Sequence, residues 1–564
     1  MLGERRGSAF WITVLLLVGS RAEGQTVSDA NLEVKLVASG ISVPTSMAFI
    51  GPGDILVLQK NNGMVRRVTN GVLQPGAVLD VAVHYSSERG LLGIATDPGF
   101  LQNHHVYLYY TESSTGADTN LSTSTPLGNR LYRYTWNGSA LVDPVLVLDL
   151  PVTTGPNHNG GVIAFGPRDA LFGVIGDLNR NGKLENFPAG PDPDDTGVIF
   201  RVTRAGQPFP DNPFFSPANP SDPMAAYFAY GVRNSFGLTF DPRTGDLWDT
   251  ENGPASYDEV NRVIPGFNSG WEQIMGPDAR DPQGQGDLWV APGSTYLDPQ
   301  FSWAATVAPT ALAFAASPVL GCALVGDLLV GDNNCGQLYR FELDAAREQL
   351  AFASSVLQDR VADNGGLTCS GELGEILFGS GFGVVTDLEN GPDGALNVVS
   401  ATLGAIYRIG PRTGAFPDAD ADGVADACDC APSQAGAYGL PVEVPTLRVT
   451  GAAATTLGWD SQAPTGGSAT SYTVVTGDLS ALRASGGFGV ACTLAEGLGA
   501  PEAVDPRPAP AAGSAFYYLA RASNACGNGS FGRGTGSPSP REVLDVSLPL
   551  RCTGLEGSVG GRLY

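Results

Sequence analysis

One pattern of apolar and polar positions recurs six times between residues 46 and 409 of this 564-residue chain. Each copy has a short apolar strand, a turn rich in Gly, Pro and Asp, a second strand of the type Leu-x-Val, and a third strand that contains an Arg. Apolar runs of this length between turn residues predict β-strands. The six copies cover residues 46–68, 91–134, 162–202, 237–263, 311–341 and 384–409.

The repeats predict an all-β fold. A unit of three or four strands cannot bury both of its faces alone, but units stacked around an axis cover one another and leave no long free edge. We therefore predict that residues 30–410 form a six-bladed β-propeller. The alternative is an array of β-sandwiches whose repeats are coincidental.

An acidic segment over residues 417–432 follows the repeats. Carboxylates at alternate positions, with Gly423 at a sharp turn, are typical of loops that bind Ca²⁺ through oxygen ligands. The segment resembles a thrombospondin type 3 or EF-hand-like loop, although Cys428 and Cys430 stand close together and an Asp replaces the usual terminal Glu. An acidic linker without metal is the alternative. The predicted Ca²⁺ ligands are Asp418, Asp420, Asp422, Asp426 and Asp429.

Residues 441–545 predict a small β-sandwich after the propeller. Apolar strands at 456–459, 471–475 and 516–521 supply Trp459 and Tyr472 for a core. The segment looks like a fibronectin type III module. Such modules usually tether or space other domains, so we expect no chemistry there.

Composition and charge narrow the class of protein. The chain has 75 Gly and 41 Pro and only 16% charged residues, which favours many short strands and turns. Its formal net charge is −25, whereas a nucleic-acid binder normally carries a basic surface, so we expect no nucleic-acid partner.

Residues 1–22 predict a signal peptide. Arg5 and Arg6 precede an apolar core at 10–18, and small residues surround a plausible cleavage site after Ala22. An uncleaved anchor is the alternative, and no other segment is apolar and long enough to span a bilayer. We therefore expect a secreted or periplasmic protein with no stable membrane span after cleavage.

The chain has eight cysteines, and export would favour disulfides between them. Their connectivity cannot be deduced from the sequence. The pairs to test first are Cys322–Cys335 and Cys492–Cys526, because each pair lies within one predicted module.

Three loops of the predicted propeller combine polar side chains with glycines. His158 precedes the third repeat, and Asp177 follows the next strand of that repeat, so a carboxylate could orient a basic imidazole. A turn histidine bonded to backbone and an Asp that caps a turn are the alternatives. Arg233 offers planar donors, and the turn at 253–254 leaves carbonyls free for a hard cation. Glu259 could bind a second cation or solvate its loop.

Taken together, these loops resemble the glucose/sorbosone dehydrogenases, which are soluble PQQ-dependent aldose dehydrogenases with a six-bladed propeller. The resemblance covers about residues 30–410, and its motifs occur in the expected order. They are segments 90–100, 157–161, 175–177, 230–234 and 268–271.

The resemblance implies a role for each matching residue. His158 would take the proton from the C1 hydroxyl of the sugar, and Asp177 would hold His158. Arg233 and Asn234 would contact the quinone oxygens of PQQ. The carbonyls of Gly253 and Pro254 would hold Ca²⁺, and Trp303 and Thr306 would pack on and bind the cofactor. The implied partners are a sugar substrate and an electron acceptor.

Three departures from the family pattern leave two functions open. Glu88 and Arg89 stand where the family usually has a Gln, residues 331–335 replace a cofactor-binding Lys, and Val384 and Thr386 replace two arginines. The three lysines of the chain all precede residue 184, so no shift of alignment restores the missing one. The two main alternatives are a PQQ-dependent aldose dehydrogenase and a non-catalytic extracellular propeller that binds carbohydrate or protein. A different propeller chemistry, such as lactone hydrolysis, is the remaining one.

Overall fold

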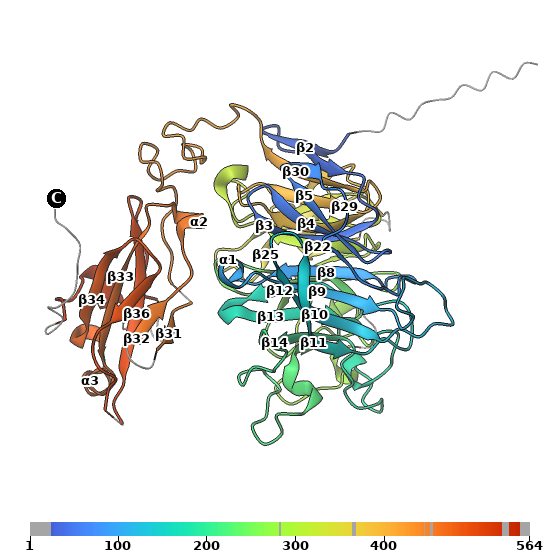
Figure 1. Ribbon diagram of the computed structural model, residues 1–564, viewed down its shortest axis with the longest axis horizontal. Coiled ribbons are helices and arrows are strands. Elements are labelled where there is room, and N and C mark those ends of the chain that lie inside the picture. The colour runs from blue at the N-terminus through green and yellow to red at the C-terminus, as the bar shows by residue number, and fades with distance from the viewer. Residues whose placement is uncertain are drawn as a thin grey trace, which may run out of the picture.

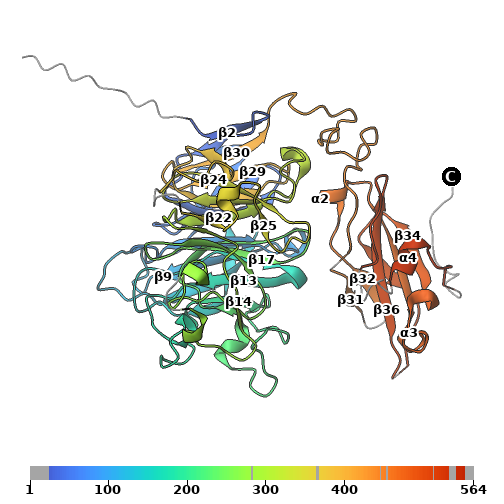
Figure 2. The same ribbon diagram turned by 180° about the vertical axis from the view of Figure 1, so that it is seen from behind.

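The computed structural model describes residues 24–280, 284–363, 368–444, 446–451, 455–511, 513–532 and 541–552. The predicted signal peptide, residues 1–22, lies outside the described residues. The described strands gather into two bodies, one formed before residue 412 and the other after residue 440, as the two opposite views show (Figures 1 and 2). Strands dominate both bodies, which confirms the all-β prediction.

Helices are few and short within the described residues. They are α1 (Phe100–Asn103), α2 (Ala463–Gly466), α3 (Leu479–Ser485) and α4 (Glu542–Val546), with several single turns of 3₁₀ helix. Among the residues that the structure describes, no helix is long and apolar enough to cross a membrane.

The larger body contains six sheets, which form the blades of a β-propeller. Blade 1 comprises β3 (Pro44–Gly51), β4 (Asp54–Gln59), β5 (Met64–Thr69), β6 (Val72–Leu73) and β7 (Leu79–Asp80). Blade 2 comprises β8 (Leu91–Thr96), β9 (His105–Glu112), β10 (Gly128–Trp136) and β11 (Leu141–Leu150). Blade 3 comprises β12 (Ile163–Gly166), β13 (Ala170–Ile175), β14 (Val198–Val202), β15 (Tyr227–Tyr230), β19 (Phe267–Asn268) and β20 (Thr295–Tyr296).

In each of the other three blades, the first three strands are antiparallel neighbours. Blade 4 comprises β16 (Ser235–Phe240), β17 (Leu247–Glu251), β18 (Asp258–Val263), β21 (Phe301–Trp303) and β26 (Val361–Ala362). Blade 5 comprises β22 (Pro309–Phe314), β23 (Leu328–Asp332), β24 (Leu338–Leu343), β25 (Leu350–Ala351), β27 (Leu377–Ser380) and β1 (Thr26–Val27). Blade 6 comprises β28 (Val385–Asn390), β29 (Leu396–Ser400), β30 (Ala405–Pro411) and β2 (Leu32–Ser39).

The blades close into a ring. The first strands contact one another in the cyclic order β3, β8, β12, β16, β22, β28 and back to β3. The N-terminal strand β2 pairs antiparallel with β30, from Leu32 opposite Pro411 to Ser39 opposite Ala405. The sixth blade is therefore completed by a strand from the opposite end of the propeller sequence.

The second strand of each blade is buried on both faces. The strands β4, β9, β13, β17, β23 and β29 are buried throughout, except at the first residue of β4 and the two ends of β9. Each lies in the middle of its blade with neighbouring blades on either side, so both sets of alternating side chains leave water. This double burial explains why β13 reads as a continuous apolar run, whereas β17 buries Asp249, Thr250 and Glu251 in the same position of its blade.

The smaller body is a two-sheet structure. One sheet holds β31 (Arg448–Thr450), β32 (Thr455–Gly458) and β35 (Glu502–Asp505). The other holds β33 (Ser471–Asp478), β34 (Cys492–Leu498), β36 (Phe516–Asn524) and β37 (Gly527–Asn528). Trp459 and Tyr472 meet edge to face in the core between them, with ring centroids 5.4 Å apart.

The four disulfides are Cys322–Cys428, Cys335–Cys369, Cys430–Cys526 and Cys492–Cys552. The two pairs expected first, Cys322–Cys335 and Cys492–Cys526, were wrong. Each expected pair lies within one predicted module, but two of the four bridges, Cys322–Cys428 and Cys430–Cys526, join different modules. Cys428 and Cys430, on either side of Asp429, connect to the propeller and to the smaller body respectively.

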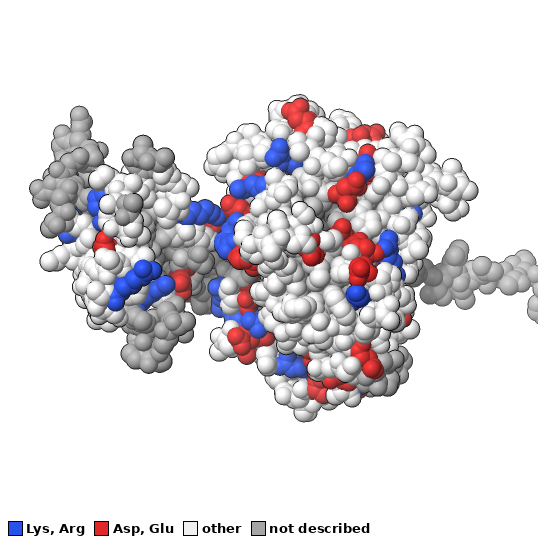
Figure 3. Space-filling model, turned by 90° about the horizontal axis from the view of Figure 1, so that it is seen from below, with Lys and Arg blue, Asp and Glu red and all other residues white. Residues whose placement is uncertain are grey.

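The surface carries its charges in mixed groups. On the face seen in Figure 3, basic side chains lie among acidic ones and much of the area is uncharged. Several arginines pair with carboxylates at hydrogen-bond distance, as Arg67 does with Asp54 (2.6 Å) and Arg130 with Asp149 (2.9 Å).

The disulfide Cys335–Cys369 should stabilise the propeller. Replacing both residues by Ala removes a cross-link over 34 residues within blade 5, which should lower the stability of the propeller by about 2–4 kcal/mol. The measurement is scanning calorimetry under non-reducing conditions. The matched control replaces Cys492 and Cys552, whose bridge lies within the smaller body, and should shift that body's transition instead. Equal shifts of both transitions by either double variant would contradict these placements.

Candidate active site in the central cavity

A cavity of about 590 Å³ lies on the ring axis, within the size range of small-molecule sites. Each blade contributes to its wall at or just before its first strand. The residues in question are Thr45, Leu92, Val162, Phe236, Thr310 and Thr386. Because all six blades meet there, side chains far apart in the sequence face one ligand-sized space.

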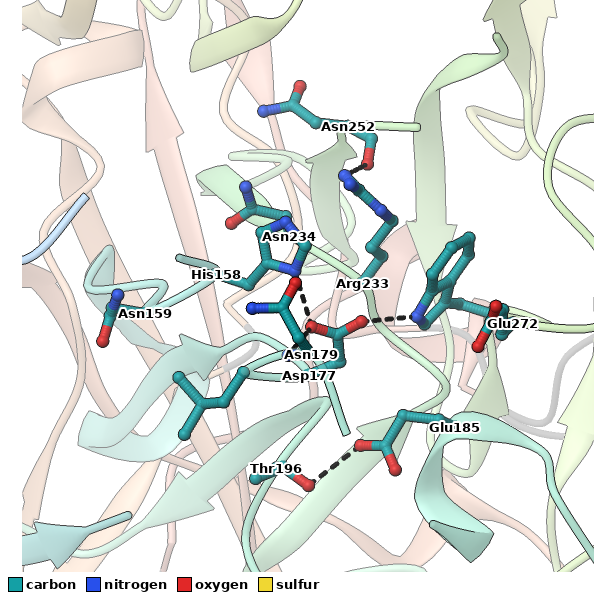
Figure 4. Close-up of polar contacts among 12 residues, drawn as sticks. His158, Asn159, Asp177, Asn179, Glu185, Thr196, Arg233, Asn234, Asn252 and Glu272 are labelled. Atoms are coloured by element: carbon teal, nitrogen blue, oxygen red, sulfur yellow. Dashed lines mark hydrogen bonds and ion pairs between the residues drawn. The ribbon is translucent and has the colours of Figure 1, made fainter. Parts of the chain in front are cut away.

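His158 and Asp177 form a buried pair at this cavity (Figure 4). His158 lines the cavity, and its Nδ1 lies 2.6 Å from Oδ1 of Asp177. The loop that carries His158 approaches the loop that carries Asp177 so closely that a Cβ at Gly176 would lie 2.6 Å from the His158 carbonyl oxygen. The sequence Ile-Gly-Asp thus needs its glycine. With Nδ1 donating to Asp177, Nε2 is left with a lone pair and can accept a proton.

Asp177 is held by three donors. The backbone N–H of Asn179 donates to Oδ1 (2.7 Å), and Nε1 of Trp271 donates to Oδ2 (2.7 Å), in addition to the contact from His158. Both oxygens of the carboxylate therefore accept hydrogen bonds, and its orientation is determined from three loops. Sequence reasoning found Trp271 only as part of a motif and missed this contact.

Arg233 lies next to this pair, with its guanidinium 5.2 Å from the centre of the Trp271 ring. Its Nη1 donates to the carbonyls of Asn252 (2.7 Å) and Gly253 (3.3 Å), and its backbone N–H donates to Oε1 of Glu251 (2.6 Å). The guanidinium is thus positioned by backbone carbonyls at the cavity wall, where a bound anion or carbonyl group can reach it.

Glu88 links two of the predicted residues. Its Oε2 accepts hydrogen bonds from the backbone N–H of His158 (2.6 Å) and from Nδ2 of Asn234 (3.2 Å). All three residues line the cavity. Sequence reasoning noted Glu88 only as a replacement for Gln, whereas the structure shows that its carboxylate joins blades 3 and 4 at the site.

Two amide oxygens at the cavity have no hydrogen-bond partner among the described residues. They are Oδ1 of Asn234 and Oδ1 of Asn252, and both atoms are buried. Buried polar atoms are normally hydrogen-bonded. A ligand with hydroxyl or N–H donors would satisfy them.

Several predicted residues do not line the cavity. Trp303 is buried in the core between blades 4 and 5, where its ring lies 5.0 Å from that of Tyr339. The carbonyl of Thr306 accepts a hydrogen bond from Nδ2 of Asn334 (3.2 Å). Gly253 and Pro254 follow Asn252, which does line the cavity. The neighbouring segment contributes Ala308 to the wall in place of Trp303 or Thr306.

Glu259 belongs to a buried acidic group with Asp249 and Glu251 on β17 and β18. Burial raises the pKa of Glu251 to about 7, and burial together with Glu251 raises the pKa values of Asp249 and Glu259. Glu259 accepts hydrogen bonds from the Gly276 N–H (2.6 Å) and Asn261 Nδ2 (3.1 Å). Both oxygens of Asp249 lack a hydrogen-bond partner among the described residues.

The acidic loop at 417–432 forms a compact group of carboxylates away from the cavity. Oxygens of Asp418, Asp420 and Asp422 lie within 4.8 Å of one another. Backbone N–H groups hold one oxygen of several of these side chains, as Gly423 does for Asp418 (2.9 Å). Three other carboxylate oxygens are buried without a partner among the described residues. They are Oδ1 of Asp418, Oδ2 of Asp420 and Oδ2 of Asp429.

Comparisons with known proteins agree with this geometry. The family model described as "Glucose / Sorbosone dehydrogenase" matches residues 41–408. The chain is 26% identical over 396 residues to the aldose sugar dehydrogenase YliI of Escherichia coli K12, which covers 68% of this chain and 94% of that protein. It is 26% identical over 265 residues to quinoprotein glucose dehydrogenase B of Acinetobacter calcoaceticus, covering 44% and 53% respectively.

A solved structure gives the same result. The PQQ-bound form of an aldose sugar dehydrogenase from Streptomyces coelicolor superimposes with a TM-score of 0.50 and 26% identity, over 68% of this chain and 99% of that one. The propeller, with its buried His–Asp pair at the cavity, therefore identifies the protein as an oxidoreductase of the sugar dehydrogenase class. Since the family model covers more than half of the sequence, the chain belongs to the glucose/sorbosone dehydrogenase family.

Asp177→Asn should disrupt the site with little change of volume. Each oxygen of Asp177 accepts from an N–H donor, so the amide NH₂ of Asn must face a donor in either orientation. We expect kcat for sugar oxidation to fall by about 10²–10⁴, as happens when an orienting Asp loses its charge, with a smaller change in KM. Asp393→Asn, at an exposed carboxylate paired with Arg408, is the control. An unchanged kcat for Asp177→Asn would contradict the orienting role.

Proposed function

We propose that this protein oxidises the C1 hydroxyl of an aldose to a lactone, with PQQ and Ca²⁺ as cofactors. The observation that carries the proposal is the buried His158–Asp177 pair at the wall of a ligand-sized cavity. Membership of the family and the names of two relatives, an aldose sugar dehydrogenase and a quinoprotein glucose dehydrogenase, support the same reaction.

In this reaction His158 acts as the base. The O–H bond of the C1 hydroxyl breaks and its proton passes to Nε2 of His158, while the C1–H hydrogen leaves as hydride and a C=O bond forms. Asp177 accepts from Nδ1 and stabilises the imidazolium that results. PQQ, when bound, would supply the acceptor for this hydride and its two electrons.

The residues on the side of the cavity formed by Arg233 and Asn234 fit such a cofactor. Arg233 offers a positioned guanidinium, and Asn234 an amide with an unpartnered oxygen. The carbonyls of Gly253 and Pro254 stay the predicted Ca²⁺ ligands. Among the described residues, the Gly253 carbonyl accepts one long hydrogen bond of 3.3 Å, from Arg233. Trp303 and Thr306 are not assigned to the cofactor. Glu259 stays the predicted ligand of a second cation.

A second function is favoured by one observation. On blades 5 and 6 the cavity wall presents the neutral side chains of Asn333, Val384 and Thr386. PQQ carries three carboxylates, and a family site without cations there would hold it weakly. The second candidate is therefore an extracellular propeller that binds carbohydrate or protein without turnover.

Export is part of the proposal. Four disulfides occur among the described residues, and such bonds form and persist in oxidising compartments. We therefore propose that the protein acts in the periplasm or outside the cell, on a sugar and an electron acceptor.

Reconstitution of the purified full-length protein separates the two candidates. With PQQ and Ca²⁺ it should reduce an artificial dye in the presence of at least one member of a panel of aldoses. His158→Ala should lower kcat by at least about 100-fold, because the base is lost. Absence of PQQ binding at high micromolar cofactor would favour the binding-only propeller, and full activity of His158→Ala would refute the assigned base.

We also propose that the acidic loop binds one Ca²⁺ independently of the cavity. Support comes from the three buried, unpartnered carboxylate oxygens of Asp418, Asp420 and Asp429. Counted from Asp418, the loop has acidic residues at positions 1, 3, 5, 9 and 12 and Gly423 at position 6, which is the spacing of an EF-hand loop. Asp422 and Asp426 complete the predicted set.

Asp420→Asn tests this site. Replacing one charged oxygen ligand should weaken Ca²⁺ binding at the loop by about 10-fold or more, because affinity depends on the number of charged ligands. Titration calorimetry of the protein without PQQ should show one fewer tight site. Asp143→Asn, an exposed carboxylate on β11, should bind as the unaltered protein does. Identical titrations for Asp420→Asn and the unaltered protein would refute the loop site.

A further inference from the structure

Lys60 reaches the central cavity from blade 1. It follows β4 directly and lines the cavity together with Ser87 and Glu88. A Cβ at Gly90 would lie 2.4 Å from the carbonyl oxygen of Lys60 and 2.8 Å from its Cγ, so the glycine that opens the Gly-Leu-Leu-Gly segment makes room for this residue. The backbone N–H of Leu91 also donates to the Lys60 carbonyl (3.0 Å).

Lys60 lies next to the part of the wall that lacks a cation. Its backbone N–H donates to the carbonyl of Val43 (3.1 Å), and the hydroxyl of Thr386 donates to the carbonyl of Pro44 (3.0 Å). Lys60 on blade 1 and Thr386 on blade 6 thus flank the same two-residue segment. The positive charge missing from the sixth blade is present on the neighbouring blade.

The ammonium group of Lys60 is only partly used by the protein. Nζ donates to the carbonyl of Ser87 (2.6 Å) and makes a long contact of 3.5 Å with Oδ1 of Asn61. An ammonium has three N–H donors, so it can still bind an anionic oxygen. The other charged or titratable groups at the cavity wall are Glu88, His158, Arg233 and Asp387.

We propose that Lys60 binds a carboxylate of PQQ and takes over the role for which blades 5 and 6 offer no basic side chain at the cavity wall. This inference rests on the proposed function. Lys60 and Arg233 would then supply the two positive charges at the cavity wall, and the cofactor would be held between blades 1 and 4. Neutral Asn333, Val384 and Thr386 would contact it without charge.

Lys60 keeps its positive charge at neutral pH. Burial lowers its pKa to about 8, and the nearby Glu88 partly opposes this decrease. A lysine with this pKa is mostly protonated at pH 7 and mostly neutral at pH 9.5. An anion that binds the protonated form should therefore bind less tightly as the pH rises through about 8.

The experiment measures PQQ binding directly, by equilibrium dialysis of the full-length protein with Ca²⁺ and without sugar. Lys60→Met should raise Kd about 10- to 100-fold, the usual effect of losing one charge-assisted hydrogen bond. Lys60→Arg should stay within a few-fold of the unaltered protein. Lys183→Met, at a lysine that pairs with Asp192 outside the cavity wall, is the matched control and should change nothing.

A pH series adds a second measurement. Between pH 7.5 and 9.5 the affinity of the unaltered protein should fall more steeply than that of Lys60→Arg, since Arg keeps its charge. Equal affinity and equal pH dependence of Lys60→Met and the unaltered protein would overturn the role of Lys60 while leaving the dehydrogenase proposal intact. If the unaltered protein binds no PQQ, the proposed function itself is overturned. Thermal unfolding shows that each variant is folded.

Discussion

Ring closure is the constraint on which the rest of this molecule depends. Blade 6 is complete only when β2, from the N-terminal region, pairs with β30 along its whole length. Side chains add to this seam, because Asp387 on β28 accepts hydrogen bonds from the Ser46 hydroxyl (2.9 Å) and the Met47 N–H (2.8 Å) on β3. Without this seam the six first strands would not surround a common axis, and the cavity would be an open groove.

The site depends on that closure in a specific way. No single blade holds the complete set of contacts around His158. Asp177 lies on the same blade as His158, but Glu88 precedes blade 2 and Asn234 precedes blade 4. Such a site is preorganised by the scaffold, since moving one blade would break hydrogen bonds to residues on others. The buried carboxyl groups of blade 4 add an unfavourable free-energy term, because burying an ionisable group removes it from water.

Much of this arrangement could be predicted from the sequence, and what could not has physical reasons. The first three strands of each blade carry local apolar patterns, and the His158 and Asp177 loops follow them directly. The outer strands β15, β21 and β27 come after long loops, and β2 pairs with a strand more than 360 residues away, so no local pattern assigns them to a blade. The disulfide connectivity was predicted wrongly for the same reason, because no local pattern identifies a cysteine partner that is distant in the sequence.

Lys60 shows a different limit of sequence reasoning. The family pattern places a lysine in the fifth repeat, where residues 331–335 of this chain contain no basic side chain. The cavity is shared by all blades, however, so a side chain from blade 1 faces the same space as one from blade 5 or 6. Trp303 is the reverse case: a residue in a matching segment points into the core between blades and not toward the axis.

The disulfides Cys322–Cys428 and Cys430–Cys526 have a mechanical consequence. Tension applied between the propeller and the far end of the smaller body would pass from Cys322 through the short segment 428–430 to Cys526. Residues 411–427, with most of the acidic loop, would carry none of this load. A protease that cut within that stretch would likewise leave the two bodies attached, because the covalent path runs around the cut.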